Sequence, residues 1–129
     1  MIRLLEKKTW LSLIFLILIA IEIFWFSSLK SVPGIKIPLL AEAYHFIVFF
    51  LFGFFLIISI KGKRNMKNKY FFLALTISIL YALSDEFHQF FIPNRTASIW
   101  DFLVDMFGVC VGMFIYLTTL KNKNTIQSS

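Results

Sequence analysis

The segment from Thr9 to Ser28 reads TWLSLIFLILIAIEIFWFSS, and its length and composition decide the class of protein. An α-helix rises about 1.5 Å per residue, so roughly 20 apolar residues cross a hydrocarbon core about 30 Å thick. The segment does not alternate apolar and polar residues, which argues against a membrane-spanning strand. We therefore predict a transmembrane helix here.

Three further apolar segments follow, and with the first they cover residues 9–28, 39–60, 70–92 and 97–120. The chain of 129 residues is 59% apolar and 19% aromatic, and its mean hydropathy is +0.81. These values lie outside the range of soluble globular proteins. We expect an all-α fold, a polytopic membrane bundle of four transmembrane helices in one domain at residues 1–120, followed by a cytoplasmic tail at residues 121–129.

Basic residues are distributed unevenly around these segments. Ten of the 13 Lys and Arg residues precede the first segment, separate the second from the third, or follow the fourth. Because positively charged loops stay on the cytoplasmic side, we predict that both termini face the cytoplasm. The net charge of +6 is then mainly a topology signal, and nucleic-acid binding is disfavoured because no basic face lies outside these loops.

Acidic residues and histidines gather toward the opposite, external end. Of the seven acidic residues only Glu6 is cytoplasmic in this topology. The helical rise puts one ionisable residue of each predicted helix roughly 9 to 12 Å inside the external boundary: Glu22, His45, Asp85 and Asp105. A charge in the middle of a span costs about 2.5 to 3.5 kcal/mol, so such groups normally face one another or a wet cavity. The shared depth predicts one polar site.

The fourth predicted helix carries one stripe of functional interest, since each residue advances about 100° around the axis. Asp101, Asp105, Gly108 and Gly112 lie on this stripe. The two glycines form a surface suited to close helix contact, and Gly53 of the second helix lies on a stripe with His45. We expect the three glycines to pack helices and the aspartates to point into the bundle.

The third predicted helix has a polar face that includes Asp85, His88 and Gln89. Glu86 is displaced toward another face. Arg95, in the turn that follows, is the only basic residue near the acidic group. Its guanidinium can pair with Glu86, with Asp101 or with a bound phosphate.

Two carboxylate-x-x-histidine pairs raise the question of a metal. The pairs are Glu42 with His45 and Asp85 with His88, a spacing that is also found in metal-binding bundles. With a further aspartate they can hold zinc or another divalent ion, and the candidate ligands are His45, Asp85, His88 and Asp105. The same spacing also serves buried hydrogen-bonded pairs, and no cofactor is required by the sequence.

Structural roles remain open for several of these residues. Ser98 and Asp101 have the spacing of a capping box, in which Asp101 serves only to cap the fourth helix. Glu22 is as compatible with a structural contact between helices as with a function. Asp105 lies one turn too deep to cap a helix and is therefore the stronger candidate for the site.

Residues 84–112, SDEFHQFFIPNRTASIWDFLVDMFGVCVG, resemble the signature of the VanZ-like membrane proteins. In that family the third span ends in Asp-Glu-x-x-Gln, a Pro-x-Arg turn follows, and the fourth helix carries Asp-x-x-x-Asp/Asn ahead of spaced glycines. The matching positions are Asp85, Glu86, Gln89, Pro93, Arg95, Ser98, Asp101, Asp105, Gly108 and Gly112. The second helix is similar around His45, but Glu42 and Phe49 stand where many members have Lys and Tyr, so a role of that Lys or Tyr does not transfer.

This resemblance implies a multi-pass protein of the bacterial cytoplasmic membrane. The family is named for a Gram-positive factor that lowers susceptibility to teicoplanin, a glycopeptide antibiotic with a lipid tail. We expect an outward-facing polar cavity that binds a membrane lipid, a lipid-linked glycan or a lipoglycopeptide. Its candidate lining residues are His45, Asp85, Glu86, His88, Gln89, Arg95, Asp101 and Asp105.

Three mechanisms remain open at this stage. As a binding module, the protein would hold an anionic headgroup with Arg95. As an enzyme, it would use His88 or Asp105 as a general base on a lipid headgroup, with or without a metal ion. As a structural membrane subunit, it would need these residues only for stability and assembly.

Overall fold

The computed structural model describes residues 2–29, 38–95 and 97–127, and these residues form five helices. A short helix, α1 (Ile2–Lys7), precedes four long ones, which are α2 (Thr9–Ser27), α3 (Pro38–Lys61), α4 (Asn68–Phe90) and α5 (Ile99–Gln127). Each long helix contains a stretch long and apolar enough to cross a membrane. The predicted all-α fold with four candidate membrane spans is confirmed, whereas the orientation of the termini stays a prediction.

The helix bounds differ from the predicted ones at the ends of the chain. α1 has no counterpart among the predicted segments, and α5 continues as a helix to Gln127, past the predicted span end at residue 120. α5 begins at Ile99, because Ser98 caps it: the Trp100 backbone N–H donates to Ser98 Oγ at 3.2 Å. Pro93, which cannot continue a helix, follows the end of α4.

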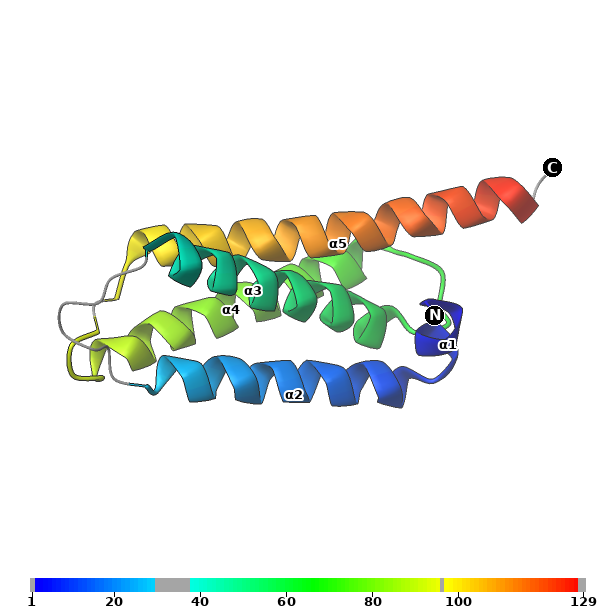
Figure 1. Cartoon of the computed structure of the whole chain (residues 1–129). Coiled ribbons are helices and arrows are strands. Elements are labelled where there is room, and N and C mark those ends of the chain that lie inside the picture. Colours follow the sequence, from blue (N-terminus) through cyan, green and yellow to red (C-terminus); the bar gives the residue numbers. More distant parts are fainter. Residues whose placement is uncertain (1, 30–37, 96, 128–129) are drawn as a thin grey trace.

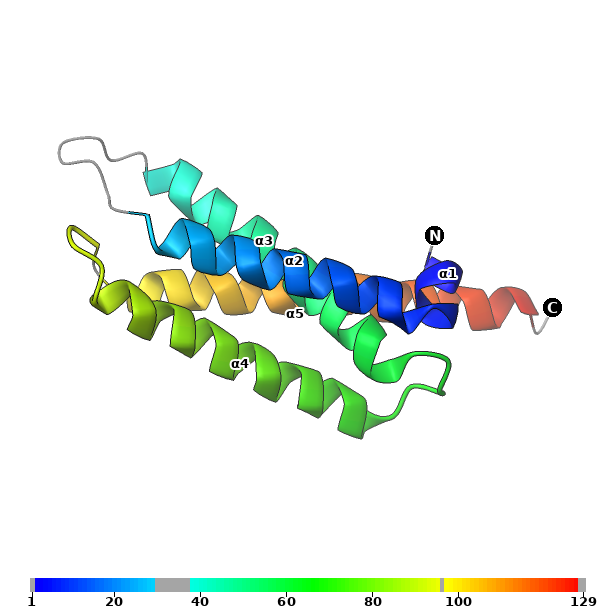
Figure 2. The same cartoon turned by 90° about the horizontal axis from the view of Figure 1, so that it is seen from below.

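The four long helices run side by side, and the two ends of the bundle are distinct (Figure 1). One end carries α1 and the C-terminus of α3, and we call it the α1 end. The other carries the α4–α5 connection, and we call it the turn end. Figure 2 shows α3 crossing α5 at an angle, with α4 along the other side of the bundle. α3 contacts all the other helices and is the central element of the fold.

Glycines allow α3 and α5 to approach closely. A Cβ atom on Gly53 would lie 2.8 Å from the Val109 backbone oxygen, and one on Gly108 would lie 2.5 Å from the Phe46 backbone oxygen. A Cβ atom on Gly112 would collide with the backbone of Phe50. All three glycines expected to pack helices therefore lie at the α3–α5 contact, where only the absence of a side chain permits the observed separation.

The interior of the bundle is apolar along most of its length, and so is its outer surface. The largest fully buried apolar side chains come from α2, α3 and α5: Tyr116, Phe49, Ile23, Ile57, Ile58, Met113 and Val109. Many large apolar side chains also point outward, including Leu80, Phe107 and Phe114. Contiguous exposed apolar surface of this kind suits contact with lipid rather than with water.

A buried polar contact holds α1 against the bundle. Oε1 of Glu6 accepts a hydrogen bond from Lys61 Nζ at 2.9 Å and one from the Tyr116 hydroxyl at 2.7 Å. All three side chains are buried, and they come from α1, α3 and α5. This contact joins the first helix to both helices of the tightest pair.

Candidate functional site

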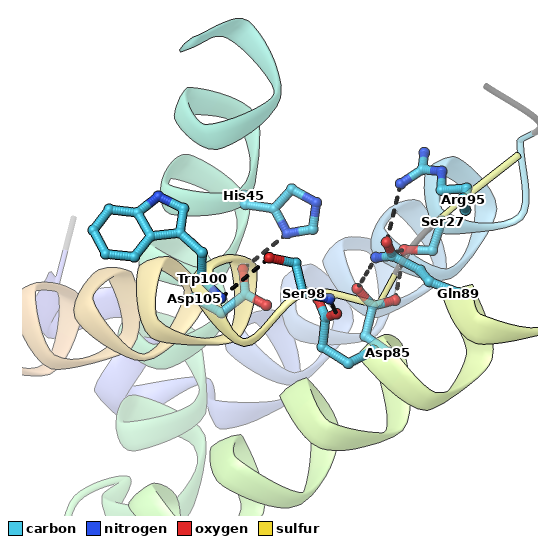
Figure 3. A network of polar contacts seen from close by, with 9 residues as sticks. Ser27, His45, Asp85, Gln89, Arg95, Ser98, Trp100 and Asp105 are labelled. Carbon is cyan, nitrogen blue, oxygen red and sulfur yellow. Dashed lines mark hydrogen bonds and ion pairs between the residues drawn. The ribbon is translucent and has the colours of Figure 1, made fainter. Parts of the chain in front are cut away.

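Four ionisable side chains meet inside the bundle near the turn end. They are His45 of α3, Asp85 and Glu86 of α4, and Asp105 of α5, and one nitrogen or oxygen atom of each lies within 4.8 Å of the others. Each side chain is less than a tenth exposed, and Asp105 is fully buried. We call these four residues the acidic cluster, and Figure 3 shows most of its contacts.

Asp85 occupies the side of the acidic cluster that faces α2. Ser27 Oγ donates a hydrogen bond to its Oδ1 at 2.5 Å, and Gln89 Nε2 donates one to its Oδ2 at 2.9 Å. Gln89 is itself held from the turn, because Arg95 Nη1 donates to Gln89 Oε1 at 3.3 Å. A continuous series of hydrogen bonds thus runs from the α4–α5 turn to the end of α2 (Figure 3).

Arg95 mainly satisfies the backbone at the end of α2. Its Nη2 donates to the Phe26 carbonyl oxygen at 2.8 Å and its Nε to the Leu29 carbonyl oxygen at 3.2 Å. Phe26 belongs to the last turn of α2, where its carbonyl also accepts a hydrogen bond from the Leu29 N–H at 3.2 Å, and Leu29 lies just past the helix end at Ser27. Among the described residues, neither of the carboxylates suggested from the sequence, Glu86 and Asp101, lies within ion-pair distance of Arg95. Arg95 therefore positions Gln89 and caps α2.

Asp105 contacts His45 through one carboxylate oxygen, and its other oxygen is not used in this contact. His45 Nδ1 lies 2.9 Å from Asp105 Oδ1, a hydrogen bond that joins α3 to α5. Within the described part of the chain, Asp105 Oδ2 has no hydrogen-bond partner. A buried polar atom without a partner is rare in folded proteins and costs free energy, so this oxygen calls for an explanation.

Glu86 belongs to the acidic cluster although helical angle had placed it on another face. α4 packs against α2, α3 and α5 with one broad buried face, and Glu86 lies at the edge of that face, on the side toward the start of α5. Its Oε2 accepts a hydrogen bond from the Ser98 backbone N–H at 2.7 Å. Its Oε1 is buried and, like Oδ2 of Asp105, lacks a hydrogen-bond partner among the described residues.

His88 lies outside the acidic cluster. Its Nε2 is 3.0 Å from Ser28 Oγ, and its ring stacks on Phe24 with centroids 4.7 Å apart. Both partners belong to the C-terminal end of α2, so His88 faces α2 and is partly exposed. The set of metal-ligating groups that the structure brings together therefore has Glu86 where the sequence suggested His88.

Two further acidic candidates also lie apart from the acidic cluster. The Glu22 side chain is exposed on α2 although its depth along the helix matches that of the cluster. Asp101 is half-buried in the first turn of α5, and the capping box forms only in part. Ser98 Oγ caps the helix, but the Ser98 N–H that Asp101 would accept is bound by Glu86 instead.

Sequence reasoning missed the serine that supports the site. Ser27 is buried and donates to Asp85, and its neighbour Ser28 contacts His88. A signal was present, because two adjacent hydroxyl residues, Ser27 and Ser28, end the first apolar segment. Their role could not be read from the sequence alone, because the partners lie about 60 residues away on α4.

The acidic cluster combines three carboxyl groups with one imidazole in a place that water does not reach freely. Three carboxylates cannot all remain charged in such surroundings without neutralisation, because burial of unpaired charge is expensive. Protons, a cation or a cationic ligand group can supply the neutralisation. The arrangement can therefore take up a proton or a positive charge.

Comparison with known proteins identifies the family. Residues 1–121 match the family model described as VanZ/LLP1. Searches of curated proteins and of solved structures each gave no match. The matched region includes α1 to α4 and α5 as far as Lys121, together with every residue of the acidic cluster. The chain therefore belongs to the VanZ/LLP1 family.

Proposed function

We propose that this protein acts in the bacterial cell envelope, where it lowers susceptibility to glycopeptide antibiotics such as teicoplanin by binding or handling a lipid headgroup or a lipid-tailed ligand. The observation that carries the proposal is the acidic cluster, in which two buried carboxylate oxygens lack partners among the described residues. Polar groups at membrane depth are costly and usually mark a functional site. The antibiotic phenotype in this proposal comes from the family and from the resemblance of residues 84–112 to VanZ-like proteins.

The surface around the turn end supports a ligand with an apolar tail. Exposed aromatic side chains surround this end on α4 and α5: Phe87, Phe90, Phe91 and Trp100. Aromatic residues of this kind favour the boundary between headgroups and acyl chains. A lipid-tailed ligand would place its tail against these rings and its polar group toward the α4–α5 turn, where Arg95 still has guanidinium N–H groups beyond the three it uses.

A second candidate function is enzymatic, and one contact favours it. The His45 imidazole is oriented by the Asp105 carboxylate at 2.9 Å, the arrangement by which a general base is commonly held in place. In this reaction class His45, with Asp105 as its orienting group, would accept a proton from a headgroup hydroxyl or from water. His88, the other base considered from the sequence, contacts α2 instead.

Antibiotic susceptibility of a sensitive Gram-positive host tests the proposal. The host expresses the intact chain, the Asp85→Asn/Asp105→Asn variant, or a Ser84→Ala control, all at equal levels in the membrane. Ser84 neighbours Asp85 on α4 but is exposed and bonds only to the Tyr81 carbonyl among the described residues, so its loss leaves the acidic cluster intact. We expect the intact chain and the control to raise tolerance to teicoplanin, and the double variant to lose this effect.

Two results would count against the proposal. If the intact chain leaves teicoplanin and vancomycin susceptibility unchanged, the glycopeptide function is wrong for this protein. If the double variant protects as well as the intact chain, the acidic cluster does not carry the function, and the residues serve stability or assembly instead.

A further inference from the structure

We infer that the acidic cluster is a binding site for a divalent metal ion, with His45, Asp85, Glu86 and Asp105 as its protein ligands. The four side chains offer one imidazole nitrogen and three carboxylate oxygens, all within 4.8 Å of one another. An ion with bonds of about 2.1 Å holds neighbouring ligand atoms about 3 Å apart and opposite ones about 4 Å apart. Small side-chain movements would bring the four atoms to these separations.

The closest pair in the acidic cluster already has the separation of two neighbouring ligands. His45 Nδ1 and Asp105 Oδ1 are 2.9 Å apart. As a hydrogen bond this contact uses only one oxygen of Asp105. As the edge of a coordination shell it would leave both atoms bound to the same ion, and the backbone of α3 and α5 would not need to move.

The partnerless oxygens are an independent sign that the acidic cluster binds a cation. Oδ2 of Asp105 belongs to a fully buried side chain, and Oε1 of Glu86 to one that is 8% exposed. Among the described residues neither atom has a hydrogen-bond donor. A bound metal ion that contacts these two oxygens would give each of them a partner, which the described protein atoms do not.

Neighbouring groups hold the cluster side chains as outer-shell residues hold metal ligands. Asp85 accepts hydrogen bonds from Ser27 and Gln89, and Glu86 accepts one from the Ser98 backbone. Ligating carboxylates are usually fixed by hydrogen bonds of this kind, which orient the oxygen that faces the metal. Each of these two residues keeps further carboxylate lone pairs for a metal ion.

Charge explains why a divalent ion suits the site better than a monovalent one. Three carboxylates with a neutral imidazole carry a charge of −3, and within the described residues no Lys or Arg forms an ion pair with them. A divalent ion reduces this to −1, and the hydrogen bond that Gln89, itself contacted by Arg95, donates to Asp85 moderates the remainder. Mixed imidazole and carboxylate ligands favour Zn²⁺ or Mn²⁺ over Ca²⁺ and Mg²⁺, which prefer oxygen alone.

Metal binding by the purified chain tests this inference directly. The protein in detergent is treated with a chelator, desalted and titrated with Zn²⁺ or Mn²⁺, with Mg²⁺ and Ca²⁺ as comparison ions. We expect saturable binding of one ion per chain and a higher thermal unfolding temperature in its presence. With Mn²⁺, electron paramagnetic resonance should show coupling to a nitrogen, and His45→Gln should abolish this coupling.

Matched variants connect the binding to the acidic cluster. Asp105→Asn and Glu86→Gln keep the side-chain shape, and each should weaken binding by more than about tenfold. His88→Gln should bind as the intact chain does, because His88 contacts α2 and lies outside the cluster. Glu6→Gln is a second control, since it neutralises a buried carboxylate at the opposite end of the bundle.

The inference is overturned if the intact chain shows no saturable binding of Zn²⁺ or Mn²⁺. It is also overturned if Asp105→Asn and Glu86→Gln, shown by circular dichroism to be folded, bind as tightly as the intact chain, or if the Mn²⁺ spectrum shows no nitrogen coupling. The site concerns the same residues as the proposed function but does not depend on it. If the chain binds a metal ion but does not change teicoplanin susceptibility, only the proposed function is contradicted. If the chain protects against teicoplanin but binds no metal ion, only the metal site is contradicted.

Discussion

The two ends of the bundle each bury a polar group of residues, but they differ in how the charge is balanced. At the α1 end the Glu6 carboxylate receives hydrogen bonds from a Lys61 ammonium and a Tyr116 hydroxyl. At the turn end three carboxylates share one imidazole, and two of their oxygens lack a partner among the described residues. Opposite charges meet at one end, whereas charges of the same sign gather at the other.

This difference separates a structural contact from a candidate site. The α1 end has its cation in place, and it joins three helices, so its role is explained by the fold alone. The acidic cluster needs protons, an ion or a ligand to be neutral, so its role is not explained by the fold alone. Buried polar residues at membrane depth thus call for a functional explanation when their charge is uncompensated.

The largest expected effect is the loss of the cation at the α1 end. Lys61→Met removes the ammonium group from its buried pair with Glu6, and breaking a buried pair in this way costs about 3 to 5 kcal/mol. We expect a decrease of this size in the free energy of unfolding, measured by chemical unfolding in detergent. The exposed Lys63→Met should change it by less than about 0.5 kcal/mol.

A double variant distinguishes the pair from its parts. Glu6→Leu combined with Lys61→Met removes both charges, so it should recover most of the stability lost in Lys61→Met alone. A double variant as unstable as the single one would mean that packing of the Lys61 side chain, and not its charge, holds the α1 end.

The next effect concerns the hydroxyl that holds Asp85. Ser27→Ala removes a buried donor 2.5 Å from the carboxylate, and hydrogen bonds to charged groups contribute about 1.5 to 3 kcal/mol. We expect a loss of stability in this range. Its neighbour gives a matched control, because Ser28 is partly exposed and Ser28→Ala should cost less than about 1 kcal/mol. Equal losses for both would contradict the assignment of Ser27 as the support of Asp85.

Neutralising the acidic cluster should act in the opposite direction. Asp105→Asn removes one charge from a fully buried side chain, and its new amide N–H groups can donate to the cluster carboxylates. In the chelator-treated chain we expect the free energy of unfolding to rise by about 1 kcal/mol. With metal present, the same measurement should show the intact chain to be more stable than Asp105→Asn, because the intact chain binds the ion more tightly. Destabilisation of the chelator-treated variant by as much as Lys61→Met would remove the distinction between the two ends.

The helices themselves could be predicted from the sequence because membrane thickness sets their length. Apolar runs of about 20 residues mark each span, and the glycines at 53, 108 and 112 mark the α3–α5 contact. α1 could not be found in this way, because a helix of six residues has no length signal and is held by Glu6 through a distant contact with Lys61.

The acidic cluster could be predicted in part. Helical rise gives depth, and depth alone brought His45, Asp85 and Asp105 to one level. Depth does not give rotation within the bundle, so Glu22 at the same level turned out to be exposed, and Glu86 turned out to be buried against α5. Rotation depends on how the helices pack, and the buried face of α4 is broad enough to include Glu86 beside Asp85 and Gln89.

The smallest expected effects test which carboxylate completes the cap of α5. Ser98→Ala removes the oxygen that caps the helix, so it should cost about 1 kcal/mol of unfolding free energy. Asp101→Ala should cost no more than about 0.5 kcal/mol, because the Ser98 N–H that a capping box would give to Asp101 is bound by Glu86. Chemical unfolding of both variants and of Glu86→Gln in detergent ranks the three losses of unfolding free energy. If Asp101→Ala costs as much as Ser98→Ala, the capping box is complete, Glu86 is not needed for it, and the acidic cluster keeps one more carboxylate free for a ligand.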